Sequence, residues 1–307
     1  MTDVSIIGAG PAGLTAAIYA LRAGWSVKIF EENIYGGQTS IIDKIENYPG
    51  FESITGMDFA SALYNQVEKL GGQFVFSKIT NVDFTQKEKT LISSNGEKYS
   101  SKTVIIANGL KRRNLGCKGE KEFIGKGVSY CATCDGAFFK SKNVVIVGGG
   151  NTAIEDALYL SNVCNKVTMI VRKDYFRGEK YLVDTVKRTS NIEIKFETVL
   201  DEIYGQKTVE GVRLKNVKTE DINELPIDGV FIAIGYEPDS KIYSSQIDID
   251  DRGYFIADET CKTNISGVYV AGDCRIKPLR QIVTATSDGA VAGNAVSEYI
   301  HKEYIVH

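Results

Sequence analysis

The chain carries the same motif twice, and this repeat limits its possible folds more than any other feature. The segment "VSIIGAGPAGLTAAIYALRAGWSVKIFEE" (4–32) aligns without a gap to "VVIVGGGNTAIEDALYLSNVCNKVTMIVR" (144–172), at a constant offset of 140 residues. Each copy holds an apolar run, a glycine-rich turn, a stretch with helical periodicity and a second apolar run. This is the strand, turn, helix and strand order of a dinucleotide-binding unit. The repeat therefore predicts an α/β protein with two nucleotide sites.

The glycine positions of each turn have separate physical roles. The first makes the tight turn, and the second lets the backbone approach a pyrophosphate at the helix N-terminus. The third packs the helix on the strand, which alanine also allows. The three positions are Gly8, Gly10 and Gly13 in the first copy and Gly148, Gly150 and Ala153 in the second. One such motif is weak evidence, but two in matching context predict two Rossmann-like, three-layer domains.

The two copies differ at the end of their second strand, where nucleotides are distinguished. The first copy ends in "IFEE", so Glu31, with Glu32 as the less favoured choice, can accept hydrogen bonds from ribose hydroxyls. The second continues as "IVRKDYFR", in which Arg172, Lys173 and Arg177 can pair with a 2′-phosphate. These residues predict an unphosphorylated adenosine, such as that of FAD, in the first site and NADPH in the second. A solvated basic turn is the alternative for the second.

Length and charge exclude several classes of protein. The 307 residues suit two domains, and a net charge of -3 gives no basic footprint for nucleic acid. No apolar run approaches the length of a membrane helix. The opening "MTDVSIIGAG" does not read as a signal peptide, so a cytoplasmic location is expected.

A cysteine pair lies in "SYCATCDGAFF" (129–139), just before the second copy of the motif. A zinc site at Cys131 and Cys134 is disfavoured because the chain has two histidines, both near its C-terminus, and no second C-x-x-C. Inert packing is a second alternative. A redox disulfide is favoured, because the spacing allows a small disulfide ring and Asp135 follows it. Asp135 can donate a proton to the sulfur that leaves if burial against Phe138 and Phe139 keeps its carboxyl group protonated. The bland alternative is that Asp135 caps the next turn, a role that is compatible with proton donation.

Together, seven motifs resemble one known family. They are "GAGPAG", "GGQ" (36–38), "ENYPGF" (46–51), "CATCDGAFF", "GGGNTA", "VRKDYFR" and "AGDCRIKPLRQIVTATSDGA". In combination, they resemble the low-molecular-weight bacterial thioredoxin reductases, which are FAD-containing pyridine nucleotide-disulphide oxidoreductases. The resemblance extends over the whole chain, and "CATCD" is its most specific element.

The resemblance implies a domain organisation and an electron path. An FAD domain formed by residues 1–111 and 242–307 would be interrupted by an inserted NADPH domain, residues 112–241, that carries the cysteines. Family members are homodimers in which electrons pass from NADPH to FAD, then to the cysteine pair and then to thioredoxin. By resemblance, Cys134 lies next to the flavin, Cys131 attacks thioredoxin and Asp135 is the acid-base residue.

The candidate binding residues follow from the motifs and the resemblance. For FAD they are Gly8, Gly10, Pro11, Ala12, Gly13, Glu31, Gly37, Gln38, Asn47, Gly272, Asp273, Arg280, Gln281 and Ile282. For NADPH they are Gly148, Gly150, Asn151, Thr152, Ala153, Arg172, Lys173 and Arg177. No metal ligands are expected.

Three departures from the family pattern bear on the electron donor. The family usually has His-Arg-Arg where this chain has Val171, Arg172 and Lys173, and a serine or threonine where it has Asn108. Lysine cannot form the bidentate fork of arginine. The alternative is therefore a flavin-dependent thioredoxin reductase that uses reduced ferredoxin. A third hypothesis, from another class, is a non-catalytic nucleotide-binding redox sensor.

Overall fold

The computed structural model describes residues 1–306, which form two compact units. Unit 1 consists of residues 1–111 and 237–306, and unit 2 of residues 112–236. The chain leaves unit 1 along β7 (Leu110–Arg112) and returns along β16 (Tyr236–Pro238), and these two strands pair with each other. The predicted α/β class is thus confirmed, whereas the cofactor of each unit stays a prediction.

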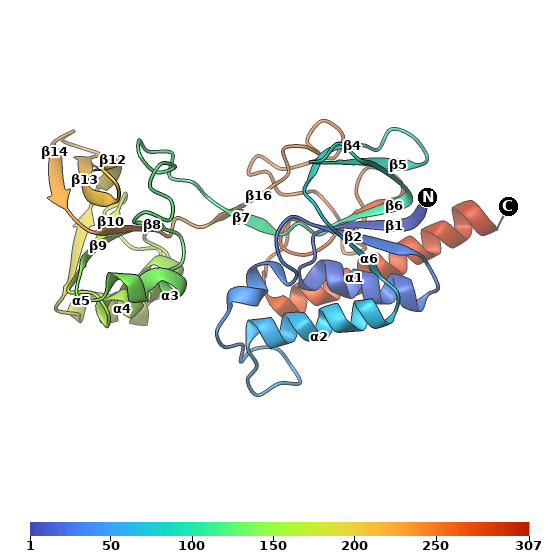
Figure 1. The fold of residues 1–307 in the computed structure, drawn as a ribbon, viewed down its shortest axis with the longest axis horizontal. Coiled ribbons are helices and arrows are strands. Elements are labelled where there is room, and N and C mark those ends of the chain that lie inside the picture. The colour runs from blue at the N-terminus through green and yellow to red at the C-terminus, as the bar shows by residue number, and fades with distance from the viewer. Residues whose placement is uncertain (307) are drawn as a thin grey trace. The chain divides into compact units, whose positions relative to one another are not determined.

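Unit 1 is a seven-stranded sheet in the order β3-β2-β1-β6-β5-β4, with β17 also paired to β6. Strands β3, β2, β1, β6 and β17 run parallel, and β4 and β5 complete the sheet as antiparallel strands. Helices α1, α2 and α6 cover one face (Figure 1). The elements are β1 (Thr2–Ile7), α1 (Pro11–Arg22), β2 (Val27–Glu31), η1 (Gly37–Ile41), α2 (Gly56–Lys69), β3 (Gln73–Phe76), β4 (Ile79–Asp83), β5 (Lys89–Ser93), β6 (Lys98–Ile106), β17 (Val268–Val270), α6 (Ile282–Ile300) and η3 (His301–Ile305).

Two glycines explain how closely α6 lies against α1. A Cβ at Gly289 would lie 2.2 Å from the Ala12 carbonyl oxygen, and one at Gly293 would lie 2.7 Å from that of Ala16. No side chain fits at these distances, so only glycine allows the two backbones to approach. The contact holds the middle of α6 against the first turns of α1, which follow the first glycine-rich turn.

Unit 2 has three layers. A five-stranded parallel sheet, ordered β11-β10-β9-β15-β8, lies between a helical layer and a separate antiparallel sheet, β12-β13-β14. One buried cluster packs beneath the helices and another beneath the antiparallel sheet. The elements are β8 (Val128–Ser129), α3 (Ala132–Asp135), η2 (Gly136–Phe139), β9 (Asn143–Val147), α4 (Asn151–Ser161), β10 (Lys166–Val171), α5 (Lys180–Arg188), β11 (Ile192–Phe196), β12 (Thr198–Gly205), β13 (Val209–Asn216), β14 (Ile222–Pro226) and β15 (Gly229–Ile232).

The sequence repeat is also a structural repeat, down to single hydrogen bonds. Val4 pairs with Val27 in unit 1, and their equivalents 140 residues later pair in the same register in unit 2. The amide of Gly8 donates to the carbonyl of Phe30 at 2.8 Å, and that of Gly148 donates to Ile170 at 3.0 Å. The two dinucleotide-binding folds are therefore confirmed.

Within residues 1–306, no helix combines the length and apolar character needed to cross a membrane.

Candidate active site and nucleotide sites

The cysteine pair forms a closed disulfide at the start of α3. Cys131 and Cys134 are joined, with their Cα atoms 5.3 Å apart. Cys131 is the N-cap residue, and its sulfur accepts a hydrogen bond from the Cys134 amide at 3.3 Å. Cys131 is half-buried and Cys134 is exposed. The Cys131 sulfur is thus held at the start of the helix, next to the exposed Cys134.

Asp135 follows the disulfide and is held by a hydroxyl. The Ser129 hydroxyl donates to Asp135 Oδ2 at 2.6 Å and accepts from the Cys131 amide at 3.0 Å. The Asp135 side chain makes no capping bond to the following η2 turn, so the capping alternative is wrong.

The expected apolar cover of Asp135 is only partly present. Phe139 is buried and packs edge to face on Phe231, with 5.2 Å between ring centroids. Phe138, however, is 74% exposed, so the expectation that both rings bury Asp135 is wrong. The reason is geometric, because these two consecutive residues of η2 point to different sides and only one can reach the core.

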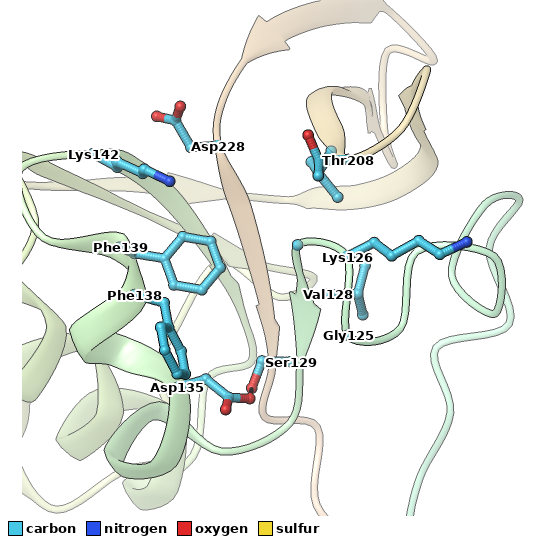
Figure 2. Close-up of a pocket in the computed structure, with 12 residues that line it drawn as sticks. Gly125, Lys126, Val128, Ser129, Asp135, Phe138, Phe139, Lys142, Thr208 and Asp228 are labelled. Atoms are coloured by element: carbon cyan, nitrogen blue, oxygen red, sulfur yellow. Dashed lines mark hydrogen bonds between the residues drawn. The ribbon is translucent and has the colours of Figure 1, made fainter.

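A pocket of about 320 Å³ opens beside Asp135 (Figure 2). Asp135 and Ser129 point toward each other at its wall, and both phenylalanines also contribute to it. The full lining is Gly125, Lys126, Gly127, Val128, Ser129, Asp135, Phe138, Phe139, Lys142, Thr208, Val209 and Asp228. An apolar group with a polar neighbour can therefore enter close to the carboxylate.

The first glycine-rich turn has the shape of a dinucleotide cradle. Gly8 has φ of +104°, and a Cβ there would lie 2.4 Å from the Ala107 carbonyl oxygen. A Cβ at Gly13 would lie 1.9 Å from the Gly8 oxygen, whereas one at Gly10 would meet no described atom within 4 Å. Gly8 and Gly13 are thus closed in by neighbouring atoms, whereas Gly10 faces open space beside the N-terminus of α1. Pro11 is the first residue of that helix. That space suits a pyrophosphate.

Glu31 is the ribose candidate that the structure favours over Glu32. The Glu31 carboxylate accepts hydrogen bonds from the amides of Ala9 and Asn33, each at 2.9 Å. It therefore lies against the glycine-rich turn, and its remaining lone pairs can accept from hydroxyls. Glu32 instead pairs with Lys78 at 2.9 Å on the surface.

Gly272 and Asp273, which follow β17, lie beside α1. Gly272 has φ of +86°, and a Cβ there would lie 2.9 Å from that of Ala12. Within residues 1–306, the Oδ1 atom of Asp273 is buried and lacks a hydrogen-bond partner. Burial raises the pKa of Asp273, although Lys277 and Arg280 oppose the effect. A buried acceptor without a partner, next to the cradle, fits a ligand that donates a hydroxyl there.

The remaining FAD candidates also belong to unit 1. The Asn47 amide donates to Gln281 Oε1 at 3.0 Å, and Gln281 caps the helix that begins at Ile282. Arg280 lies over the Tyr254 ring at 4.2 Å. Gln38 donates to the Leu110 carbonyl, and Gly37 lies next to Gly10 in the cradle.

The second glycine-rich turn repeats the cradle with a different rim. A Cβ at Gly148 would lie 2.3 Å from the Ala233 oxygen, and one at Gly150 would meet no described atom within 4 Å. Val171, the equivalent of Glu31, is buried, and a Cβ at Gly149 would lie 2.9 Å from its Cγ1. The second rim therefore presents a methyl group where the first presents a carboxylate.

The loop after β10 places the basic residues beside this second turn. The Arg177 amide donates to the Gly149 carbonyl at 2.7 Å, and the Asn151 side chain exchanges hydrogen bonds with Glu179. Thr152 is exposed and Ala153 is buried in the first turn of α4. Arg172, Lys173 and Arg177 are all exposed, and Lys173 also donates to the Tyr175 hydroxyl at 2.8 Å. The loop is already held against the second turn by these hydrogen bonds, and its basic side chains are free to contact a phosphate there.

Two features of the site have no signature in the sequence. One is the Ser129 hydroxyl beside Asp135. The other is a buried ion cluster in which Arg275 and Lys277 both donate to Asp288 at 2.8 Å, while Asp288 also accepts from the Gly272 amide. Isolated serine and aspartate residues give no pattern, so only the fold brings these groups together.

Comparison with known proteins places the chain among flavoenzymes. The family model described as "Pyridine nucleotide-disulphide oxidoreductase" matches residues 2–289. The chain is 41% identical to a thioredoxin reductase of Peptoclostridium litorale, over 98% of this chain and 97% of that protein. The solved thioredoxin reductase of Lactococcus lactis is 36% identical with a TM-score of 0.88, and the match covers 98% of this chain and all of the other.

A ferredoxin-flavin thioredoxin reductase of Clostridium acetobutylicum is a more distant structural neighbour. It is 32% identical with a TM-score of 0.55, over 98% of this chain and 99% of that one. The family match and the full-length identity agree with the disulfide and the two cradles. The chain belongs to the pyridine nucleotide-disulphide oxidoreductase family.

Proposed function

We propose that the protein is a thioredoxin reductase that uses NADPH and FAD to reduce the disulfide of thioredoxin. The observation that carries this proposal is the Cys131–Cys134 disulfide in unit 2, joined in one chain to two dinucleotide cradles with different rims. Relatives that are thioredoxin reductases, and that match this chain over nearly its whole length, support the proposal.

Each cradle fits one of the two cofactors. In unit 1, Glu31 would hold the ribose of FAD, and Asp273, whose Oδ1 atom has no hydrogen-bond partner among the described residues, would hold the ribityl region. In unit 2, Arg172 and Arg177 would hold the 2′-phosphate of NADPH, which Glu31 would repel from the first site. When bound, FAD supplies hydride chemistry, accepting two electrons from NADPH and delivering them to the disulfide.

The two thiols then reduce the partner in two successive thiol-disulfide exchanges. The Cys131 thiolate attacks the partner disulfide, a mixed disulfide forms and one partner thiolate leaves. The Cys134 thiolate attacks the Cys131 sulfur, the second partner thiolate leaves, and the Cys131–Cys134 disulfide forms again. Two electrons pass to the partner, and Asp135, which follows Cys134, supplies a proton to a leaving sulfur.

The pocket beside Asp135 supports a protein as the electron acceptor. Phe138 is a large apolar side chain that is mostly exposed, and it lines the pocket together with Lys126 and Lys142. An exposed aromatic residue next to a pocket is typical of a docking surface. A thioredoxin docked there would bring its disulfide toward Cys131.

Ferredoxin is the second candidate donor, and one observation favours it. Val171 replaces a polar residue at the phosphate rim, which leaves fewer groups to recognise NADPH. The cradle itself is complete, however, and Arg172 and Arg177 are retained, so NADPH is the preferred donor. The non-catalytic sensor hypothesis is disfavoured because its thiols would need no docking pocket beside the acid.

A homodimer, as the family resemblance implies, is part of the proposal. So is a cytoplasmic location, which is supported by Cys117, Cys164, Cys261 and Cys274, all outside any disulfide.

Thioredoxin-dependent turnover with different donors tests this proposal. We expect NADPH to support it, with NADH and reduced ferredoxin far weaker. Arg172→Ala should raise the KM for NADPH roughly 10- to 100-fold, because a charge-assisted phosphate contact contributes about 1.5–3 kcal/mol. It should leave the KM for NADH nearly unchanged.

The matched control is Arg188→Ala, which removes another exposed arginine of unit 2, at the end of α5. It should change neither KM. Turnover with ferredoxin but not with NADPH would overturn the choice of donor. Equal losses for NADPH and NADH in Arg172→Ala would overturn the role of that residue.

A further inference from the structure

Ser129 occupies a fixed position next to the reactive cysteines. It is the last residue of β8, it is 5% exposed, and it pairs in register with Phe231 of β15. Its place is therefore set by the sheet of unit 2. The disulfide and its acid lie on the short helical segments that follow this strand.

The Ser129 hydroxyl contacts the backbone of Cys131 and the carboxylate of Asp135. Its oxygen accepts a hydrogen bond from the Cys131 amide at 3.0 Å, and it donates one to Asp135 Oδ2, with 2.6 Å between the two oxygens. The carbonyl oxygen of Cys131 is a second acceptor, at 3.3 Å. Figure 2 shows the Ser129 and Asp135 side chains meeting at the pocket wall.

These contacts satisfy Asp135 in both of its protonation states. A serine hydroxyl has one hydrogen and two lone pairs, and the Cys131 amide uses one lone pair throughout. When Asp135 is a carboxylate, the Ser129 hydrogen points to Oδ2. When Asp135 carries a proton, the acid can donate to the free lone pair, and the Ser129 hydrogen can turn to the Cys131 carbonyl. Neither state leaves a partly buried polar group without a partner.

We propose that Ser129 is a positioning residue whose hydroxyl rotates with the protonation of Asp135 and so keeps that acid aligned with the sulfur atoms through the whole cycle. The inference rests on the proposed function. In the exchange step, the proton moves from the Asp135 carboxyl to the sulfur that leaves, the carboxylate is left behind, and the Ser129 hydrogen turns back to it. No electron passes through Ser129, and no further reactant is needed.

A matched pair of variants isolates the hydroxyl. Ser129→Thr and Ser129→Val have the same shape and differ only by a hydroxyl against a methyl group, so any effect of the added carbon is common to both. With NADPH and thioredoxin, we expect Ser129→Val to lower kcat roughly tenfold, because it misaligns a general acid without removing it. Ser129→Thr should recover most of that loss. The KM for thioredoxin should stay within about twofold in both.

The same pair in an Asp135→Asn background separates a positioning role from a structural one. If Ser129 acts through Asp135, then Ser129→Val should cost less than about twofold once the acid is gone. FAD content and flavin reduction by NADPH should match the parent in every variant.

Three outcomes would overturn the inference alone, and a fourth would overturn the proposed function as well. One is an equal loss for valine and threonine, and another is a valine loss of the same size in both backgrounds. A parent protein that turns over while Ser129→Val keeps full activity would refute the role of Ser129 alone. A parent that never reduces thioredoxin would refute the proposed function, and this role with it.

Discussion

Cys134→Ser should abolish reduction of thioredoxin while the protein keeps its FAD. A serine hydroxyl cannot form the disulfide that receives the electron pair, so turnover should fall at least about 1,000-fold, as expected for loss of a reactive group in a catalytic pair. Cys134 is exposed and outside the buried core of unit 2, so the fold should be retained. Turnover measures the loss of activity, and FAD content measures whether the cofactor is retained. Free thiols, counted after denaturation, show whether the disulfide is absent.

The matched control for this variant is Cys117→Ser. It makes the same atomic change at a free, half-buried thiol of unit 2. Burial, next to the charge of Glu120, raises the pKa of Cys117 to about 11, so this thiol is protonated at neutral pH and takes no part in exchange. Its variant should keep full turnover. An active Cys134→Ser enzyme would show that the disulfide is not on the electron path.

Asp288→Asn should destabilise unit 1 by roughly 3–5 kcal/mol, the usual cost of breaking a buried ion pair. Asp288 is 6% exposed and is the shared acceptor for Arg275 and Lys277, whose side chains are also buried. Without its charge, two buried cations would lose their shared carboxylate, and Arg275 would keep a longer contact of 3.8 Å with the exposed Glu259. The Gly272 amide, which orients the segment that carries Asp273, would also be held less firmly, so FAD should dissociate more readily.

The effect of Asp288 should depend on pH in a defined direction. Burial alone would raise the pKa of Asp288, but hydrogen bonds from Arg275, Lys277 and the Gly272 amide outweigh it and lower the pKa below its usual value. A lowered folded pKa adds stability above the unfolded value, about 3.9, and that stability is lost as the pH falls through the folded pKa. The parent and Asp288→Asn should therefore differ fully at neutral pH and converge in acid.

Urea unfolding of the FAD-loaded protein, followed by tryptophan fluorescence, measures this difference. The single tryptophan, Trp25, packs against the core of unit 1 and reports on that unit. Asp258→Asn is the control, because it makes the same change at an exposed aspartate that bonds only to its own turn. It should cost less than about 1 kcal/mol. Equal losses in the two variants would contradict the role of the buried cluster.

The sequence predicted the repeated fold well because glycine positions leave a strong local pattern. Gly8 approaches Ala107, and Gly148 approaches Ala233, so closely that no side chain fits at either glycine. The fold therefore requires glycine at these positions, and the requirement is visible in the sequence. The disulfide was also predicted, from the cysteine spacing, the neighbouring Asp135 and the lack of further zinc ligands, and it is present in the structure. The choice of Glu31 over Glu32 as the ribose acceptor stays a prediction, which is supported by the contact of Glu31 with the Ala9 amide and the pairing of Glu32 with Lys78.

Contacts between distant segments were not predictable in this way. The buried cluster of Asp288 joins residues 11 and 13 positions apart with a backbone amide, and no local pattern marks such a set. Phe138 was expected to cover Asp135 because it is apolar, but whether it reaches the core depends on the turn of η2. Ser129 lies six residues before Asp135, and only the bend between β8 and α3 brings the two together.

Anaerobic titration with NADPH, followed by oxidised thioredoxin, tests whether the cysteine pair exchanges electrons with a bound flavin. We expect the flavin absorbance to bleach within seconds. We also expect two electron pairs to be taken up per subunit, one by FAD and one by the Cys131–Cys134 disulfide, and both to be returned when thioredoxin is added. A protein that binds no flavin, or a flavin that takes up its pair while the disulfide stays closed, would contradict this electron path.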